Sequence, residues 1–247
     1  MDAAGTNGKI LVYGATGGVG QCLARRLAAA GHPLHLVARD APRLQALATA
    51  LGAGFSAVDV TAEGAFAQVA DAAGTPLSGL AYAVGSINLK PFARLTMADF
   101  QRDFQLNAAA AALAVQAALP ALRAAPGGRA SVVLFSSVAA GRGFALHASI
   151  AMAKAAVEGL VRALAAELAP AIRVNAIAPS LLDTPLAQGI VGNARLREAV
   201  AASHPLGRIG QADDAAALAA FLLSAQADWI TGQVLGVDGG RGAVAGK

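Results

Sequence analysis

The amino-acid sequence predicts an α/β fold, a doubly wound domain whose seven-stranded parallel sheet is covered by helices on both faces. Short apolar segments alternate with longer segments of helical periodicity, the pattern of a parallel sheet with crossover helices. The short segments are continuously apolar, as are strands that are buried on both faces. A glycine-rich turn joins the first short segment to the first long one. The 247 residues contain no linker or repeat, so we expect one domain over residues 1–247.

The predicted strands are the short apolar segments, in which valine, leucine and isoleucine recur without polar interruption. Seven of them follow one another along the chain. Their ranges are 10–13, 34–37, 55–58, 80–84, 131–135, 174–177 and 234–237.

The predicted helices are the longer segments between these strands, rich in alanine and leucine at helical spacing. Gly31 and Pro170 follow two of them and are typical helix stops, and Ser149 is placed to cap the start of the fifth. The six ranges are 19–30, 43–51, 65–73, 98–122, 150–168 and 213–223.

Two segments fall outside this alternation. Residues 1–8 indicate a short flexible tail. Residues 181–210 combine loop and short helices, and an insertion near the carboxyl ends of parallel strands forms a wall of the ligand crevice. We therefore expect 181–210 to be a substrate loop or lid, and its Leu, Ala and Val content favours an apolar substrate.

Composition excludes several classes of function. The net charge is +4, but the basic residues are scattered, which argues against a nucleic-acid partner. The apolar segment 106–122 is interrupted and short for a bilayer, so no membrane partner is expected. The single cysteine, Cys22, allows no internal disulfide and is interpreted as buried packing. These features predict a soluble, cytoplasmic protein without a metal site.

The glycine-rich turn predicts a dinucleotide site. It runs from Gly14 through Thr16, Gly18 and Val19 to Gly20 and opens the first helix directly after the first strand. Glycines there permit a tight turn and a close approach of the backbone to a pyrophosphate, which binds at the positive end of the helix.

A second pattern lies further along the chain. Ser137 is followed by Ile150 and then, four residues later, by Lys154. Together with the glycine turn, this spacing closely resembles the short-chain dehydrogenase/reductase family, in which serine, tyrosine and lysine occupy these three places. The resemblance implies a Rossmann-like NAD(P)-binding domain and an oxidoreductase activity. It also implies that Ile150 occupies the position of the tyrosine that donates the proton.

The resemblance extends over nearly the whole chain and implies further site residues. Asn107 resembles the asparagine whose backbone anchors a water in the proton relay. Tyr82, Ala83 and Val84 stand where the family has Asn-Asn-Ala, so only the following glycine of that motif is retained. The remaining implied cofactor contacts are Asp59, Val60, Gly85, Lys154, Pro179, Leu182 and Thr184.

The end of the second predicted strand bears on the choice of cofactor. By resemblance, an acid selecting NAD would stand at position 38, which is Ala38, and Arg39 follows it. An arginine there can pair with a 2′-phosphate, so NADP(H) is preferred, with NAD(H) still possible. Two readings remain open against this: Arg39 as a solvated loop residue, and Asp40 as the acid for the ribose.

Three hypotheses for the chemistry remain open, because an isoleucine has no proton to give. In the first, His147 supplies the proton, against an alternative in which it faces solvent or caps the helix. His204 in the lid is a further candidate, with a surface position as the favoured interpretation. In the second, hydride goes to a conjugated alkene that is protonated elsewhere. In the third, the chain is a catalytically impaired NADP(H)-binding module or scaffold.

The expected substrate is a small, apolar carbonyl, alcohol or enone. Family resemblance also implies a homodimer or homotetramer, with the predicted helices 98–122 and 150–168 at the interfaces.

Overall fold

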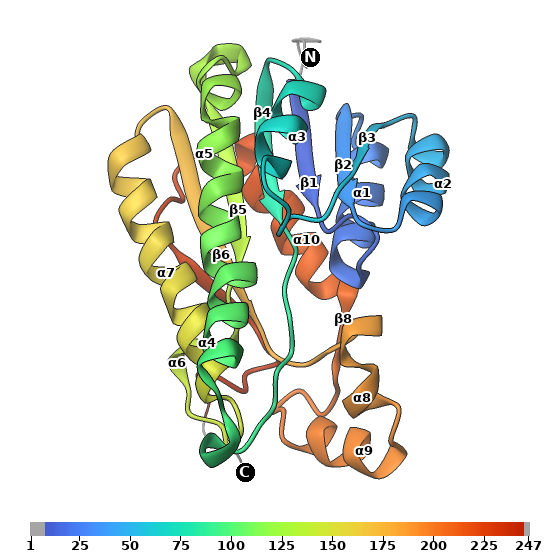
Figure 1. Ribbon diagram of the computed structural model, residues 1–247, viewed down its shortest axis with the longest axis vertical. Helices are drawn as coiled ribbons and strands as arrows, with labels where there is room; N and C mark the ends of the chain where they lie inside the picture. The colour runs from blue at the N-terminus through green and yellow to red at the C-terminus, as the bar shows by residue number, and fades with distance from the viewer. Residues whose placement is uncertain (1–7, 245–247) are drawn as a thin grey trace.

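The computed structural model describes residues 8–244 and confirms the predicted fold class (Figure 1). Seven parallel strands form one sheet in the order β3-β2-β1-β4-β5-β6-β9. Because the strand order reverses between β1 and β4, the carboxyl ends of these two strands mark the ligand crevice. The strands are β1 Lys9–Tyr13, β2 Leu34–Ala38, β3 Gly54–Ala57, β4 Leu77–Tyr82, β5 Ala130–Phe135, β6 Ile172–Pro179 and β9 Val234–Val237.

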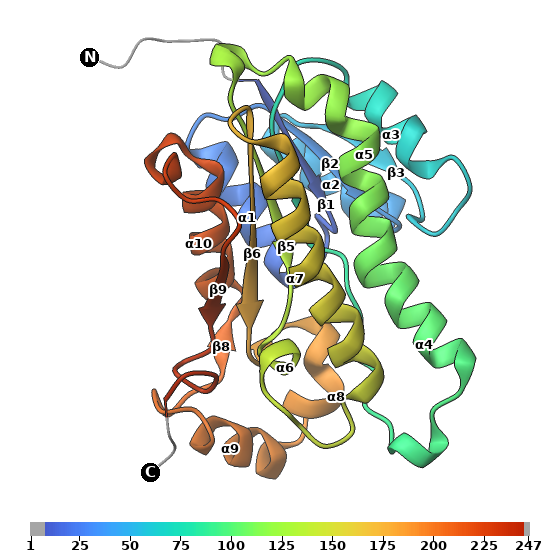
Figure 2. The same ribbon diagram turned by 90° about the vertical axis from the view of Figure 1, so that its left-hand side faces the viewer.

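Helices cover both faces of the sheet, and each face has its own apolar core (Figure 2). One face is covered by α1 Gly18–Ala29, α2 Ala41–Leu51 and α10 Ala212–Leu223. The other is covered by α3 Ala65–Ala73, α5 Ala110–Arg123 and α7 Ala148–Leu168. Strands that are buried from both sides explain the continuously apolar segments of the sequence.

The predicted helix 98–122 is wrong as a single α-helix. It divides into α4 Met97–Phe104, a π-helical turn Gln105–Ala109 and α5. In the turn, the side-chain amide of Asn107 donates to the carbonyl oxygen of Asp103 at 2.8 Å. Such π-turns occur frequently at functional sites. The combined segment Met97–Arg123 is long and apolar enough to span a bilayer, but half of its most apolar window is buried inside the protein, as in a core helix.

Several predicted boundaries move. Strand β4 ends at Tyr82 rather than at 84. The start of α7 also differs, because His147 occupies the N-cap position and Ser149 lies inside the helix, so the prediction of Ser149 as the cap is wrong. The Oγ of Ser149 is buried without a hydrogen-bond partner among the described residues. Of the expected tail, residues 1–7 lie outside the described residues. Gly8 is buried and accepts a hydrogen bond from Ser78, so it belongs to the fold.

Residues 181–210 form a loop with short helices at the carboxyl ends of the strands, as predicted (Figures 1 and 2). A small apolar cluster of Ala187, Val191 and Ile209 holds the segment together. The strand pair β7–β8 ties its two ends to each other. The elements are β7 Leu182–Asp183, a 3₁₀ turn Pro185–Ala187, α8 Gln188–Val191, α9 Ala194–Ala202 and β8 Gly210–Gln211.

An aromatic pair lies where β1 and β4 end. The rings of Tyr13 and Tyr82 are buried with centroids 5.6 Å apart, and Phe66 lies 5.9 Å from Tyr13. Burial raises the pKa of both phenols well above the ordinary value. The hydroxyl of Tyr82 donates to the carbonyl oxygen of Leu106 at 3.0 Å. Aromatic packing, with one hydrogen bond to the π-turn, therefore supports this edge of the site.

Candidate active site

The glycine turn has the geometry that a bound pyrophosphate requires. Gly14 has φ +76°, and a Cβ on Gly20 would overlap the carbonyl oxygen of Gly14. A Cβ on Gly18 would lie 2.6 Å from the side chain of Thr184, so these two predicted cofactor residues are in contact. No side chain caps the start of α1, which leaves its first amides available to an anion. The residues present therefore fit a dinucleotide.

At the end of β2, the guanidinium of Arg39 is exposed and lies 3.7 Å from a carboxylate oxygen of Asp59. Hydrogen bonds from Thr61, together with the nearby Arg39, lower the pKa of Asp59. The carboxylate of Asp40, the alternative acid for the ribose, is used within the protein: it caps α2 by accepting a hydrogen bond from the amide of Arg43 at 3.1 Å. This leaves Arg39 and Arg43 as the cations beside a predicted adenosine site.

Arg43 is a residue that the sequence reasoning missed. Its guanidinium donates to the carbonyl oxygen of Thr16 in the glycine turn at 3.3 Å. The predicted contact Val60 is only 7% exposed and packs in the core beneath the same region. The structure thus places Thr16, Arg39, Asp59 and Val60 around one end of the crevice.

A cavity of about 460 Å³ opens at the other end, beside the carboxyl ends of β4, β5 and β6. It brings together Ser137, His147, Ile150 and Lys154, which are spread over the sequence. Among the described residues, no aspartate or glutamate lines it. The predicted cofactor residues on its wall are Val19, Gly85, Pro179, Leu182 and Thr184.

Two side chains that line this cavity retain hydrogen-bonding capacity for a ligand. Ser137 Oγ caps the short helix α6 Val138–Gly141 by accepting from the amide of Ala139 at 3.1 Å, which leaves its own proton free to donate. Nδ1 of His147 lies 2.6 Å from the carbonyl oxygen of Ala145. A carbonyl only accepts, so Nδ1 carries a hydrogen and Nε2 is the atom left for other partners.

Lys154 is buried, and its ammonium donates to the carbonyl oxygen of Phe135 at 2.8 Å. Burial lowers the pKa of this amine to about 8, partly opposed by the negative charge of Asp103. Ile150 lies one helical turn before Lys154 and is 6% exposed. A Cβ on Gly85 would lie 3.3 Å from Lys154 Nζ, so the glycine allows this close packing.

Asn107 lies behind the cavity wall. Its side-chain oxygen accepts from the amide of Ser86 at 3.3 Å, and its amide donates to Ser86 Oγ at 3.0 Å. These bonds tie the π-turn to the segment after β4. The polar groups of the Asn107 side chain are thereby engaged within the protein.

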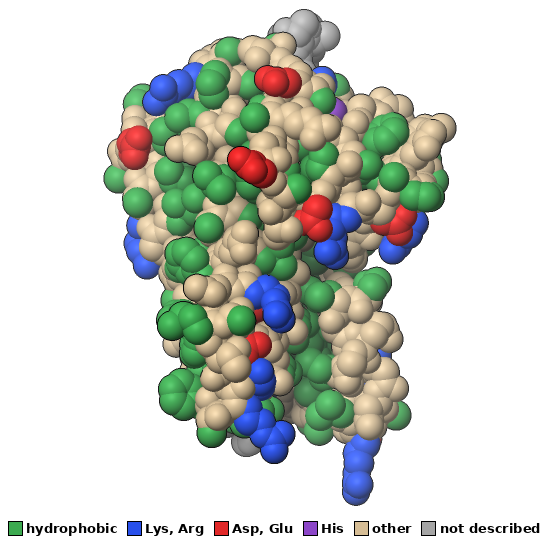
Figure 3. All heavy atoms as spheres, viewed as in Figure 1, with side chains coloured by type: hydrophobic (Ala, Val, Ile, Leu, Met, Phe, Trp, Pro, Cys, Tyr) green, Lys and Arg blue, Asp and Glu red, His purple; other side chains and the backbone are tan. Residues whose placement is uncertain are grey.

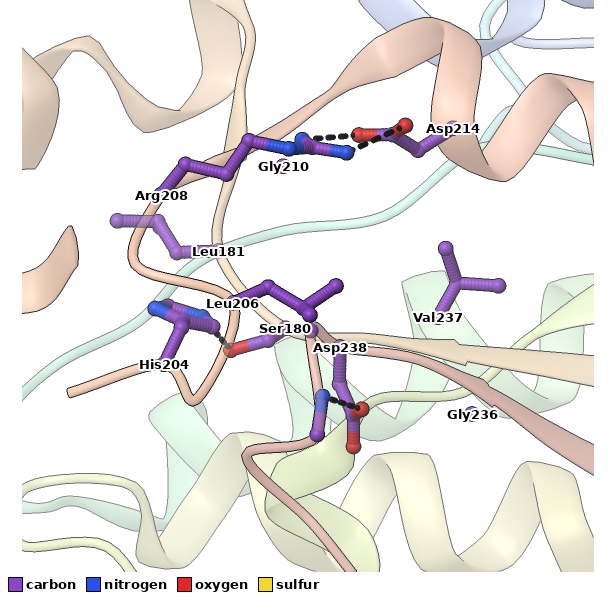
Figure 4. A pocket seen from close by; sticks show the side chains of 12 residues that line it. Ser180, Leu181, His204, Leu206, Arg208, Gly210, Asp214, Gly236, Val237 and Asp238 are labelled. Carbon is purple, nitrogen blue, oxygen red and sulfur yellow. Dashed lines mark hydrogen bonds and ion pairs between the residues drawn. The ribbon is translucent and has the colours of Figure 1, made fainter. Parts of the chain in front are cut away.

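Three further features of the site were not predicted from the sequence. His204 is buried rather than on the surface, and its Nε2 lies 2.8 Å from Ser180 Oγ (Figure 4). The guanidinium of Arg241 also lines the cavity. Leu146, next to His147, has φ +68°, the only positive φ of a non-glycine residue among residues 8–244. Backbone strain of this kind gathers at functional sites.

Comparison with known proteins gives consistent results. Residues 14–241 match the family model described as enoyl-(acyl carrier protein) reductase. The chain is 34% identical over 241 residues to a tropinone reductase homolog of Arabidopsis thaliana, covering 93% of this chain and 88% of the relative.

Two solved structures are similar over most of their lengths. One is a short-chain type dehydrogenase/reductase from Mycobacterium ulcerans, with 31% identity, a TM-score of 0.89 and coverage of 97% of this chain and 91% of that one. The other is a gluconate 5-dehydrogenase from Burkholderia cenocepacia in complex with NADP and tartrate, with 26% identity, a TM-score of 0.89 and 96% coverage of both chains. From the fold, the cavity and these matches, the chain belongs to the short-chain dehydrogenase/reductase family of oxidoreductases.

Proposed function

We propose that this protein is an NADPH-dependent oxidoreductase that transfers hydride to or from a small carbonyl, alcohol or enone substrate and uses a modified proton relay. The supporting observation is that Ser137, His147, Ile150 and Lys154 line one cavity. Much of the remaining wall is apolar, from residues such as Leu89, Leu146, Leu186, Ile190 and Leu196, which suits an apolar substrate body.

The cofactor assignment follows from the glycine turn and the end of β2. Gly14, Gly18 and Gly20 would hold the pyrophosphate, and Arg39 with Arg43 would pair with a 2′-phosphate. Position 38 offers only an alanine methyl to the ribose. The NADP in the gluconate 5-dehydrogenase structure supports the same choice, with NAD(H) as the weaker alternative. When bound, NADPH supplies the hydride.

Proton delivery is assigned to His147. Ser137 would donate a hydrogen bond to the substrate oxygen, and His147 would deliver the single proton from Nε2 while Nδ1 stays hydrogen-bonded to the carbonyl of Ala145. Lys154 would hold the nicotinamide ribose, and its positive charge favours the developing alkoxide. The charge is largely present at neutral pH because the pKa of the amine is about 8.

The alternative is a nucleotide-binding module. One observation favours it: Lys154 Nζ and the Asn107 side chain are both already hydrogen-bonded within the protein. Fluorescence titration with NADPH and NADH, followed by NADPH oxidation with panels of cyclic ketones and enones, separates the two functions. The oxidoreductase proposal expects turnover of at least one ketone or enone. Tight NADPH binding without turnover on either panel supports the module.

We also propose that the chain forms a homodimer or homotetramer through the face made by α4, α5 and α7. Exposed apolar side chains are visible on this side of the molecule in Figure 3. Phe104, Leu113 and Met152 are 46–50% exposed there, and such patches favour association. Light scattering of a Leu113→Glu variant tests this, with a loss of mass relative to wild type expected.

A further inference from the structure

Arg241 belongs to a rigid turn that lies against the candidate active site. The carboxylate of Asp238 accepts from the amides of Gly240 at 2.9 Å and Gly242 at 2.8 Å, which holds the turn closed. The guanidinium of Arg142 donates to the carbonyl oxygen of Arg241. Because Arg142 follows α6, which Ser137 caps, this bond joins the C-terminal turn to the segment that carries Ser137 and His147.

The guanidinium of Arg241 lines the cavity without an acidic partner. It lies 4.7 Å from the ring centroid of Phe144, in a cation–π contact. None of the ion pairs within residues 8–244 includes it. Burial, and the positive charge of Arg142, lower the pKa of Arg241 below the ordinary value. A partly desolvated cation without a counterion is stabilised by an anion that binds beside it.

Ser180 lies beside this guanidinium and is hydrogen-bonded to His204, a contact that Figure 4 shows. Nδ1 of His204 lies 2.7 Å from the carbonyl oxygen of Val200, so Nδ1 carries a hydrogen. In the neutral imidazole, Nε2 then accepts the hydroxyl hydrogen of Ser180 at 2.8 Å. This leaves a lone pair of Ser180 Oγ for Arg241 Nη1, which lies 3.4 Å away. The chain of bonds orients the guanidinium, and His204 is 3% exposed, so the arrangement is built into the interior.

The charges of the cavity favour a negatively charged ligand. Its wall carries Lys154 and Arg241 and, within the described residues, no acidic side chain. Lys154 is assigned to the cofactor, which leaves Arg241 unassigned. Apolar side chains make up much of the remaining wall, among them Phe144, Leu196 and Val200.

We infer that Arg241, oriented by Ser180 and His204, forms a subsite for a carboxylate group, and that the substrate is an apolar ketone, alcohol or enone that bears a carboxylate. This inference rests on the proposed function and narrows its substrate class. Arg241 binds the carboxylate by charge-assisted hydrogen bonds, while the apolar wall holds the body of the substrate. Ser180 and His204 are positioning residues that act through the guanidinium.

A matched pair of ketones tests the subsite. The probes are 3-benzoylpropionate and its methyl ester, which differ in the negative charge. With wild-type protein, kcat/KM for the acid exceeds that for the ester, and Arg241→Gln lowers the acid's value by about 10- to 100-fold while leaving the ester's unchanged. Arg123→Gln is the control for net charge, because Arg123 is exposed at the end of α5, by the amino ends of the strands. Equal loss for acid and ester, or no preference in wild type, overturns the inference.

Calorimetry separates this result from a failure of the proposed activity. Titrating 3-benzoylpropionate into NADP⁺-saturated protein measures binding without turnover. Binding to wild type that weakens about 10-fold or more in Arg241→Gln, but not in Arg123→Gln, supports the subsite even if no ketone is reduced. Equal affinity of Arg241→Gln and Arg123→Gln for the acid contradicts the subsite.

His204→Gln tests the positioning role of His204. This variant is expected to raise KM for the acid more than it lowers kcat, and an unchanged KM contradicts the positioning role.

Discussion

Replacing His147 by asparagine removes the proposed proton donor while preserving the loop that holds it. The asparagine amide can take the place of imidazole Nδ1 and still donate to the carbonyl oxygen of Ala145, now 2.6 Å from Nδ1. Only the Nε2 position is lost. The free energy of unfolding should therefore change little, and an effect on turnover reports on proton transfer.

The expected loss follows from the chemistry of general acids. Removing a positioned donor lowers kcat by about 10² to 10⁴, or roughly 3–5 kcal/mol of transition-state stabilisation. The Kd for NADPH should change little, because the proposed contacts of the glycine turn, Arg39 and Arg43 with the cofactor are left intact.

A second substitution in the same background makes the test specific. Ile150→Tyr places a phenol one helical turn from Lys154 and beside the open cavity. It should restore at least about 10-fold of the kcat lost in His147→Asn. Steady-state NADPH oxidation measures both variants, with His32→Asn as a control just before the amino end of β2, whereas the cavity lies at the carboxyl ends of the strands. A kcat for His147→Asn within about twofold of wild type, with no gain from Ile150→Tyr, refutes the role of His147.

Three further predictions concern charges in the fold and the cofactor site. Lys154→Met removes a buried amine whose pKa is about 8, so it should raise the free energy of unfolding at pH 7 by about 1–3 kcal/mol, as measured by thermal unfolding. The same substitution should weaken NADPH binding, as measured by cofactor titration. Burial lowers the pKa of His35 to about 4, so the unfolded chain takes up its proton first as pH falls from about 6.5. Stability should therefore decline between pH 6.5 and 4, by on the order of 1–3 kcal/mol in urea titrations, and decline less in His35→Gln. Arg39→Ala should raise the Kd for NADPH by about 10-fold or more and leave that for NADH unchanged, and equal effects on both cofactors would argue against a 2′-phosphate contact.

The parts of the fold that could be predicted depend on local pattern. Alternation of apolar and helical segments gave the sheet, and the glycine turn gave the start of α1. The spacing of Ile150 and Lys154 gave their common helix face, because four residues make about one turn. The π-turn was hidden, since the sequence 98–122 is compatible with a continuous helix. Within this turn Asn107 is hydrogen-bonded to Ser86, 21 residues away, and such a contact leaves no local signal in the sequence.

The missed site residues depend on contacts between distant segments. Ser180 and His204 are 24 residues apart, and Ser180 and Arg241 are 61 apart, so neither pairing leaves a local signal. The lid supplies part of the apolar wall of the cavity, whereas the charge of Arg241 in that wall comes from the C-terminal turn. The burial of His204 could not be predicted for the same reason. Next to Pro205 in a loop, His204 was expected to be exposed, but the carbonyl of Val200 and the hydroxyl of Ser180 hydrogen-bond both of its ring nitrogens in the interior.

The central claim is the proposal that this cavity supports hydride transfer although Ile150 stands where the family resemblance implies a proton-donating tyrosine. Deuterium transfer tests it most directly: the protein is incubated with each C4 epimer of [4-²H]NADPH and the ketone and enone panels, and products are analysed by mass spectrometry. We predict deuterium in the reduced product from one epimer, at a rate that His147→Asn lowers by about 10² or more. Tight binding of NADPH with no deuterium in any product would contradict the claim and identify a nucleotide-binding module.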